Sequence, residues 1–183
     1  KPSLGRRGSI MATKTLFMRG DVRTASFCGS SSAFAFDRHF EWLRKLGSGS
    51  FADVYAVRHK TRPDERYAVK VLRKEFQSRA ERANYLQEAQ LANELPRHGN
   101  IVTYFRAWQD AQVLYVQIEL CEGGSLRDRM KTEALHLPVA ELQVWELTKQ
   151  VASGLAHIHA HGMLHCDIKP DNVLVDGSGT YKI

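Results

Sequence analysis

From Phe40 onward, apolar and polar residues alternate in short runs that turn-forming residues separate. Aromatic and β-branched residues recur in these runs at the two-residue period of a strand with one buried face. The first two runs are joined by a Gly/Ser turn. The pattern predicts five strands in a small antiparallel sheet, at residues 40–49, 52–60, 66–74, 100–108 and 111–120.

Two longer segments have the period of a helix. In 76–95 apolar residues recur every three or four positions, and Pro96 ends the segment. In 139–161 the spacing is clearer, and Gly162 marks the stop. The apolar stripe predicted for this second helix consists of Val144, Leu147, Val151, Leu155 and Ile158.

The order of these elements predicts an α+β fold with two lobes. A sheet with one helix comes first, at 37–120, and a mostly helical part follows at 121–183. Between them, the Gly-rich residues 121–126 form a link into a short helix. After the long helix, a short strand at 173–175, a turn at 176–179 and a strand starting at Thr180 are expected. A cleft between two lobes is where ligands usually bind.

The positive charge of the chain is concentrated at its beginning. Residues 1–36 carry six Lys/Arg against one acid, so they account for +5 of the net charge of +6. This Ser-rich, basic segment reads as a flexible tail, with an organelle transit peptide as the alternative. Its "RRGSI" motif makes Ser9 a weak candidate for phosphorylation. Because the rest is almost neutral, the domain is not expected to bind nucleic acid.

The remaining composition argues against a membrane-spanning chain and against a disulfide-bonded one. No run of about 18 apolar residues is present, so no transmembrane segment is expected. The three cysteines, Cys28, Cys121 and Cys166, are widely spaced and odd in number. They fit neither a disulfide framework nor a CxxC metal site, which favours a reducing, intracellular compartment.

The Gly/Ser turn is the first segment with candidate chemistry. Gly47 and Gly49 allow the backbone to approach a ligand closely, and turn amides can face phosphate oxygens. A plain hairpin turn is an equally good interpretation of this segment alone. Ala52 stands where a third glycine would be usual; Ala is small, but it loses access to positive φ.

A second candidate is Lys70, which lies between apolar residues on the third predicted strand. A twisted hairpin returns this strand under the glycine turn, where an ammonium can meet phosphates. Such a lysine needs an anion to hold it, and Glu88 on the following helix is the natural partner. The alternative is an edge lysine and a helix acid that are both simply solvated.

The octapeptide "HCDIKPDN", residues 165–172, has the densest polar chemistry. Asp167 can accept a proton from a hydroxyl or orient it. Lys169 can neutralise phosphate charge, and Asn172 offers a neutral oxygen to a hard cation such as Mg²⁺. Taken alone, the segment is equally compatible with a surface turn rich in turn-forming residues.

Taken in order, these motifs resemble those of a eukaryotic protein kinase domain, and the resemblance covers about residues 40–183. It implies a two-lobed kinase fold with ATP and Mg²⁺ as cofactors and a protein as substrate. Asp167 and Lys169 then correspond to the catalytic pair, and Asn172 to a Mg²⁺ ligand. Ile118 corresponds to the gatekeeper of the ATP pocket, followed by the hinge. The full set implied for ATP is Leu46, Gly47, Ser48, Gly49, Ser50, Phe51, Val54, Ala68, Lys70, Glu88, Ile118, Glu119 and Cys121.

Cys166 narrows the resemblance. Most members of the family have Arg before the catalytic Asp, and Cys166 cannot replace its charge. We expect Cys166 to be a small apolar filler, with a redox switch as the alternative. The Ser/Thr-type loop without this Arg is most similar to the Wee/Myt group, which phosphorylates cyclin-dependent kinases in complex with cyclin and so inhibits them. That group works in the nucleus or cytoplasm. The alternatives are a Ser/Thr kinase of another subfamily, a pseudokinase scaffold and, remotely, a nucleic-acid-binding module.

The resemblance also implies a further motif beyond Ile183. The family's D-F-G motif, whose Asp is the main Mg²⁺ ligand, would come within a few residues of this position. Without that motif, residues 1–183 alone are expected to bind Mg-ATP weakly and to be inactive. The apolar surface of the 139–161 helix is expected to be exposed.

Overall fold

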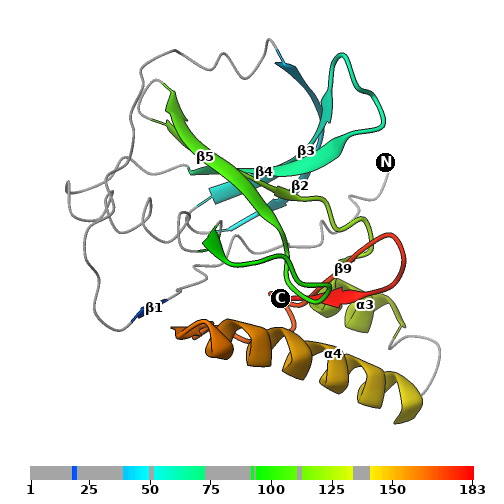
Figure 1. Cartoon of the computed structure of the whole chain (residues 1–183). Helices are drawn as coiled ribbons and strands as arrows, with labels where there is room; N and C mark the ends of the chain where they lie inside the picture. The colour runs from blue at the N-terminus through cyan, green and yellow to red at the C-terminus, as the bar shows by residue number, and fades with distance from the viewer. Residues whose placement is uncertain are drawn as a thin grey trace.

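The computed structural model describes residues 18–19, 39–49, 52–72, 92, 94–110, 113–133 and 141–183. A sheet forms one part of the molecule. The described residues after position 120, which include the long helix, form the other (Figure 1).

The sheet has five strands, all paired antiparallel, as the alternating pattern predicts. Their order is β2-β3-β4-β6-β5, so the central strand β4 lies between β3 and β6. The strands are β2 (Phe40–Ser48), β3 (Ala52–His59), β4 (Arg66–Leu72), β5 (Tyr104–Asp110) and β6 (Val113–Glu119).

One strand starts later than the sequence predicts. β5 begins at Tyr104, not at Asn100. The backbone groups just before it bond to the far end of the chain: Val102 N donates to Ile183 O at 2.9 Å, and Ile183 N donates to Asn100 O at 3.0 Å. Because these groups are committed elsewhere, they cannot join the ladder with β6.

Alternation along the strands gives the sheet two apolar faces. One face consists of Ala52, Val54, Ala68, Leu72, Leu114, Val116 and Ile118, joined by Val102. We call it the ATP-side cluster because it contains residues that the sequence predicts for ATP binding. The other contains Phe40, Val57, Val69 and Trp108. The ATP-side cluster also receives Leu174 from the second half of the chain. This face therefore adjoins the helical part.

The described residues after position 120 form two helices and several short strands. The helices are α3 (Leu126–Glu133) and α4 (Glu141–Ala160), and the strands are β7 (Gly124–Ser125), β8 (Met163–Leu164), β9 (Leu174–Val175) and β10 (Tyr181–Lys182). β10, β9 and β7 form a small sheet in that order. α3 begins with a reciprocal cap, since Asp128 N donates to Ser125 Oγ at 3.1 Å and Ser125 Oγ donates to Asp128 Oδ2 at 2.7 Å.

α4 follows the predicted helix to within two residues and ends where Gly162 adopts a positive φ of 70°. Four stripe residues, Leu147, Val151, Leu155 and Ile158, pack in a core with Met163, Val173 and Ile183. Val144, at the start of the stripe, is instead 48% exposed, and its neighbours Leu142 and Trp145 are exposed too. Exposed apolar surface is expected for the 139–161 helix as a whole, whereas its large exposed apolar side chains lie on the first turns of α4.

Several predictions fall largely outside the described residues. Of the helix predicted at 76–95, only Ala92 and Glu94 are described as helical. Of the tail predicted at 1–36, only β1 (Met18–Arg19) is described, and it pairs antiparallel with β8. Within the described part of the chain, no helix has both the length and the apolar character needed to cross a membrane.

Candidate functional site

The glycine turn lies between β2 and β3. Gly47 faces Val54 across the ladder, and Gly49 N donates to Ala52 O at 2.9 Å. Ser48 Oγ donates to Asp53 Oδ1 at 2.6 Å, while Lys45 Nζ lies 2.7 Å from the same oxygen. Hydrogen bonds and an ion pair therefore join the strand residues on either side of the turn. Ser50 and Phe51 lie outside the described residues.

Ala52 fits the turn without a glycine. It is a buried residue of β3, 4% exposed, and belongs to the ATP-side cluster of the sheet. Among the described non-glycine residues, only Cys166 has a positive φ. The conformation that Ala adopts poorly is thus not needed at position 52.

Five residues that the sequence predicts for an ATP pocket belong to the ATP-side cluster. Val54, Ala68 and Ile118 are buried in it, and Leu46 and Cys121 pack against it. Leu174 of β9, which was not predicted, packs on the same cluster from the second half of the chain. Its signal was its place in the apolar "VLV" directly after Asn172, which was interpreted only as a strand.

Burial also changes the chemistry of the Cys121 thiol. Loss of hydration and the nearby carboxylate of Glu119 raise the pKa of Cys121 to about 12. The thiol is therefore protonated and unreactive near neutral pH, so Cys121 contributes to the cluster as a small apolar side chain.

Lys70 lies in the middle of β4, between Val54 of β3 and Val116 of β6. Its ammonium is 5.7 Å from the ring centre of Tyr104, a cation–π distance. Its charge also helps to lower the pKa of His165 in the segment 165–172. Glu88, its predicted partner, lies outside the described residues, so that ion pair stays a prediction.

The three polar residues predicted to act together in 165–172 do converge. Asn172 Nδ2 donates to the Asp167 backbone oxygen at 2.6 Å and to Asp167 Oδ2 at 3.0 Å. Lys169 Nζ lies 3.1 Å from Asp167 Oδ1 and 3.2 Å from Oδ2. The carboxylate of Asp167 is thus oriented by one amide and one ammonium, as a hydroxyl-orienting group requires.

His165 supports the backbone that carries this carboxylate. It is 2% exposed, and burial lowers its pKa to about 4, against which the charge of Asp167 acts in the opposite direction. The imidazole is therefore neutral near pH 7. Its Nδ1 can accept the backbone N–H of Asp167, 3.4 Å away.

The loop is also anchored to α3. Arg127 N donates to Pro170 O at 2.9 Å, and its guanidinium lies 3.3 Å from Asp171 Oδ2. Leu126 N donates to Val173 O at 2.8 Å. Residues on both sides of Asn172 are therefore fixed to the start of one helix.

Cys166 does not fill apolar space, although its residue type predicts that role. Its side chain is exposed, and its φ is +58°, in the left-handed region that non-glycine residues seldom adopt. The turn of the backbone between His165 and Asp167 directs the intervening side chain outward, which residue types alone could not predict.

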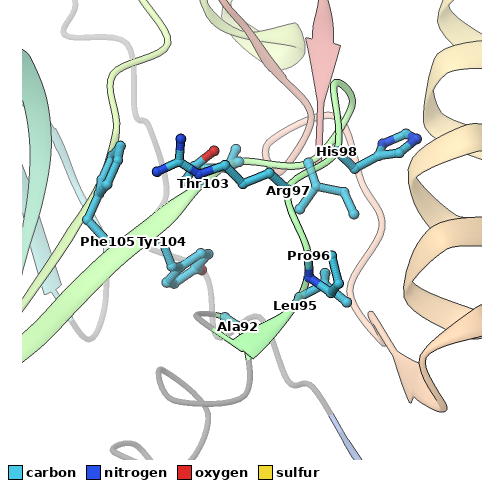
Figure 2. Close-up of a pocket in the computed structure, with 10 residues that line it drawn as sticks. Ala92, Leu95, Pro96, Arg97, His98, Thr103, Tyr104 and Phe105 are labelled. Atoms are coloured by element: carbon cyan, nitrogen blue, oxygen red, sulfur yellow. The ribbon is translucent and has the colours of Figure 1, made fainter.

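A pocket of about 220 Å³ lies beside this site, between the end of the predicted 76–95 helix and the start of β5. Figure 2 shows Tyr104 and Phe105 on one side of it and Leu95 and Pro96 on the other. None of its lining residues is a predicted ATP or catalytic residue, although the ring of Tyr104 also faces Lys70. The pocket therefore adjoins the candidate site without forming it.

The donor set is compatible with Mg²⁺ bound chiefly through phosphates. In the described residues, no three His, Cys, Asp or Glu side chains are grouped to hold a metal. Mg²⁺ in nucleotide sites characteristically takes one or two protein ligands and completes its shell with phosphate and water. The amide of Asn172, already oriented by Asp167, fits that role.

Comparison with known proteins shows which family the chain is similar to. The model of the protein kinase domain matches residues 40–183. The mitosis inhibitor protein kinase wee1 of Schizosaccharomyces pombe is 36% identical over 160 residues, 87% of this chain and 18% of that protein. A membrane-associated tyrosine- and threonine-specific cdc2-inhibitory kinase of Drosophila melanogaster is 35% identical over 140 residues, 76% of this chain and 25% of that protein. The serine/threonine-protein kinase Nek4 of Mus musculus is 36% identical over 143 residues, 78% of this chain and 18% of that protein.

The chain spans about a fifth to a quarter of the length of these three relatives, 18 to 25%. The match nevertheless includes both the sheet with the glycine turn and the loop with Asp167. From the family match and the two-part fold together, this chain belongs to the protein kinase family.

Proposed function

We propose that this region binds Mg-ATP and transfers its γ-phosphate to a protein hydroxyl, in a kinase that inhibits cyclin-dependent kinases as the Wee/Myt group does. The observation that carries the proposal is the carboxylate of Asp167, held by Lys169 Nζ at 3.1 Å and by Asn172 Nδ2 at 3.0 Å. Bound Mg-ATP would supply the phosphoryl group.

Each residue of the loop has a distinct role in this proposal. Asp167 orients the substrate hydroxyl and accepts its proton. Lys169 stabilises negative charge on the transferred group, and the Asn172 amide oxygen is one metal ligand. Phosphoryl transfer depends mainly on positioning and on charge stabilisation, so these short contacts suit the chemistry.

The sheet would hold the nucleotide. The turn that begins at Gly47 and the ammonium of Lys70 would lie at its phosphates, although the amide of Gly49 itself is bonded to Ala52 O. The adenine would lie against the ATP-side cluster, and the backbone of Glu119 and Cys121 would be the hinge that bonds it. Glu88 pairs with Lys70 in this proposal, and Ser50 and Phe51 belong to the phosphate-covering turn. The cluster supports this assignment because it joins residues of the sheet to the segment after the polar loop. The residues are Leu46, Val54, Ala68 and Ile118 from the sheet side and Leu174 from β9.

The choice of substrate rests on the relatives and on Cys166. Two of the three relatives are described as a mitosis inhibitor and as a cdc2-inhibitory kinase. Cys166 stands where most kinases have an arginine. We therefore expect transfer to the glycine-loop tyrosine or threonine of a cyclin-dependent kinase bound to its cyclin.

A Ser/Thr kinase of another subfamily is the second candidate. Nek4, a serine/threonine-protein kinase, is as similar to this chain as wee1, at 36% identity for both. Overall identity therefore does not separate the two candidates, and the substrate has to be measured.

The test is a phosphate-transfer assay on the full-length protein that contains this chain. It would use Mg-ATP with two acceptors, a cyclin-dependent kinase with its cyclin and a generic basic peptide. Asp167→Asn should lower transfer about a thousandfold, since the proton acceptor is lost, while nucleotide binding is retained.

Each outcome distinguishes the candidates. Transfer only to the glycine-loop tyrosine or threonine of the cyclin-dependent kinase supports the inhibitory function. Transfer only to the basic peptide favours another Ser/Thr subfamily. Binding of ATP without any transfer, unchanged in Asp167→Asn, contradicts both and points to a scaffold.

A further inference from the structure

A buried lysine outside the predicted site contacts the candidate hinge. Lys182 of β10 is 8% exposed, and its Nζ lies 2.9 Å from Glu119 Oε1 at the end of β6. Asp176 Oδ2 is 3.9 Å from the same nitrogen. One ammonium thus stands between two carboxylates that are far apart in the chain.

The second oxygen of Glu119 is also engaged. Thr103 N donates to Glu119 Oε2 at 3.1 Å, and Glu119 N donates to Thr103 O at 2.9 Å. The backbone and the side chain of Glu119 are therefore both bonded to Thr103. Any change in the side chain of Glu119 acts directly on the backbone where the hinge begins.

Because the Lys182–Glu119 ion pair is largely buried, loss of either partner should destabilise this part of the protein. The exposed fractions of the side chains are 10% for Lys182 and 24% for Glu119. Exposed ion pairs contribute little, but removing one partner of a buried pair leaves a charge without compensation. Here, loss of the ammonium would also leave Glu119 and Asp176 as two neighbouring like charges.

Lys182 is held in turn by elements of the second half of the chain. Its neighbour Ile183 bonds through its backbone to Asn100 and Val102. Tyr181 N donates to Gln150 Oε1 of α4 at 2.8 Å. The position of Lys182, and through it that of Glu119, is therefore coupled to the long helix.

We propose that Lys182 is a positioning residue for ATP, which fixes the hinge backbone by holding the side chain of Glu119. The inference rests on the proposed function, in which that backbone bonds the adenine. Lys182 does not touch the reacting atoms, so it sets nucleotide affinity and leaves the rate at saturating ATP unchanged.

The experiment compares Lys182→Met, Lys182→Arg and the double variant Glu119→Gln/Lys182→Met in the full-length protein. Lys182→Met should weaken Mg-ATP binding and raise KM for ATP about tenfold, with kcat unchanged. The double variant should recover most of the affinity, because the glutamine amide carries no unpaired charge and can still accept the bond from Thr103. Lys182→Arg should retain part of it.

A second measurement does not depend on nucleotide. The amide of Thr103 should exchange its hydrogen faster in Lys182→Met and return toward the original rate in the double variant. Lys149→Met, at an exposed position of α4, is the matched control and should change neither quantity.

Two failures are distinguishable. If the unmodified protein binds no Mg-ATP, the proposed function itself is wrong and the role of Lys182 falls with it. If the unmodified protein binds Mg-ATP and Lys182→Met only lowers Tm, with affinity and Thr103 exchange unchanged, Lys182 is merely structural and the inference is wrong.

Discussion

The sheet and the loop 165–172 both contribute to the candidate site, but they are held in different ways. The sheet is fixed by five antiparallel strands and by apolar side chains that are 0 to 6% exposed at its centre, such as Val69, Leu114 and Val116. The loop is in neither helix nor strand, and side-chain bonds around Asp167 set its shape.

This difference implies different responses to substitution. Apolar burial is shared among many contacts and acts on the stability of the whole domain. The bonds of Asp167 are few and directional, so each one acts on the geometry of a single carboxylate. We expect changes in the sheet to alter mainly stability, and changes in the loop to alter mainly the reaction.

Leu114→Ala should have the largest effect in the sheet. Leu114 is 1% exposed in the ATP-side cluster, so the change should lower the free energy of unfolding by about 2–5 kcal/mol. Denaturant unfolding would measure it, with Leu43→Ala, at a 41% exposed position of β2, as the control. Equal losses in the two variants would contradict a stability role for the cluster. So would a fall in kcat per folded molecule with unchanged stability.

Lowering the pH should destabilise the fold through His165, which belongs to the loop but is buried, unlike Asp167. Its pKa is about 4 when buried and about 6.5 when unfolded, so the unfolded state binds the proton more readily. The contribution is complete above pH 6.5 and is lost as the pH falls toward 4, by roughly 3 kcal/mol. His165→Asn should flatten the stability curve in this window.

His98 adds a smaller slope in the same direction, because burial lowers its pKa as well. The curve of His165→Asn should therefore keep a residual pH dependence. An unaltered slope between pH 6.5 and 4 would show that His165 is not neutral and buried in the folded protein.

Asn172→Ala should have the smallest effect on stability and a clear effect on rate. It removes both amide bonds to Asp167 and the proposed metal ligand, so kcat should fall about a hundredfold while Tm changes little. Asp171→Asn, in the same loop but bonded to Arg127 and not to Asp167, is the control. If the two variants lose rate equally, the orientation of Asp167 by Asn172 is not what matters.

Much of the sheet was predictable because its information is local. Alternating residues and the Gly/Ser turn predicted the positions of all five strands, with the start of one displaced from Asn100 to Tyr104. The displacement arose because Asn100 and Val102 bond to Ile183, more than 80 positions away. No periodicity within a strand contains that contact.

In the loop, too, residue types were informative, whereas the backbone conformation was not predictable. Residue types, together with the order of the other motifs, indicated Asp167, Lys169 and Asn172, because phosphate chemistry restricts which side chains can serve. The exposure of Cys166 depended on a single backbone angle and was predicted wrongly.

The sequence by itself therefore determined the order of the elements and the family resemblance, and it marked the polar loop as a candidate site. Each element and each motif depends on residues close together in the chain. Only the tertiary structure brought Leu174 onto the ATP-side cluster and Lys182 onto Glu119. Each of these contacts joins the five-stranded sheet to the short strands near residue 183. These partners depend on how the sheet packs against the rest of the domain, and burial makes the contacts strong.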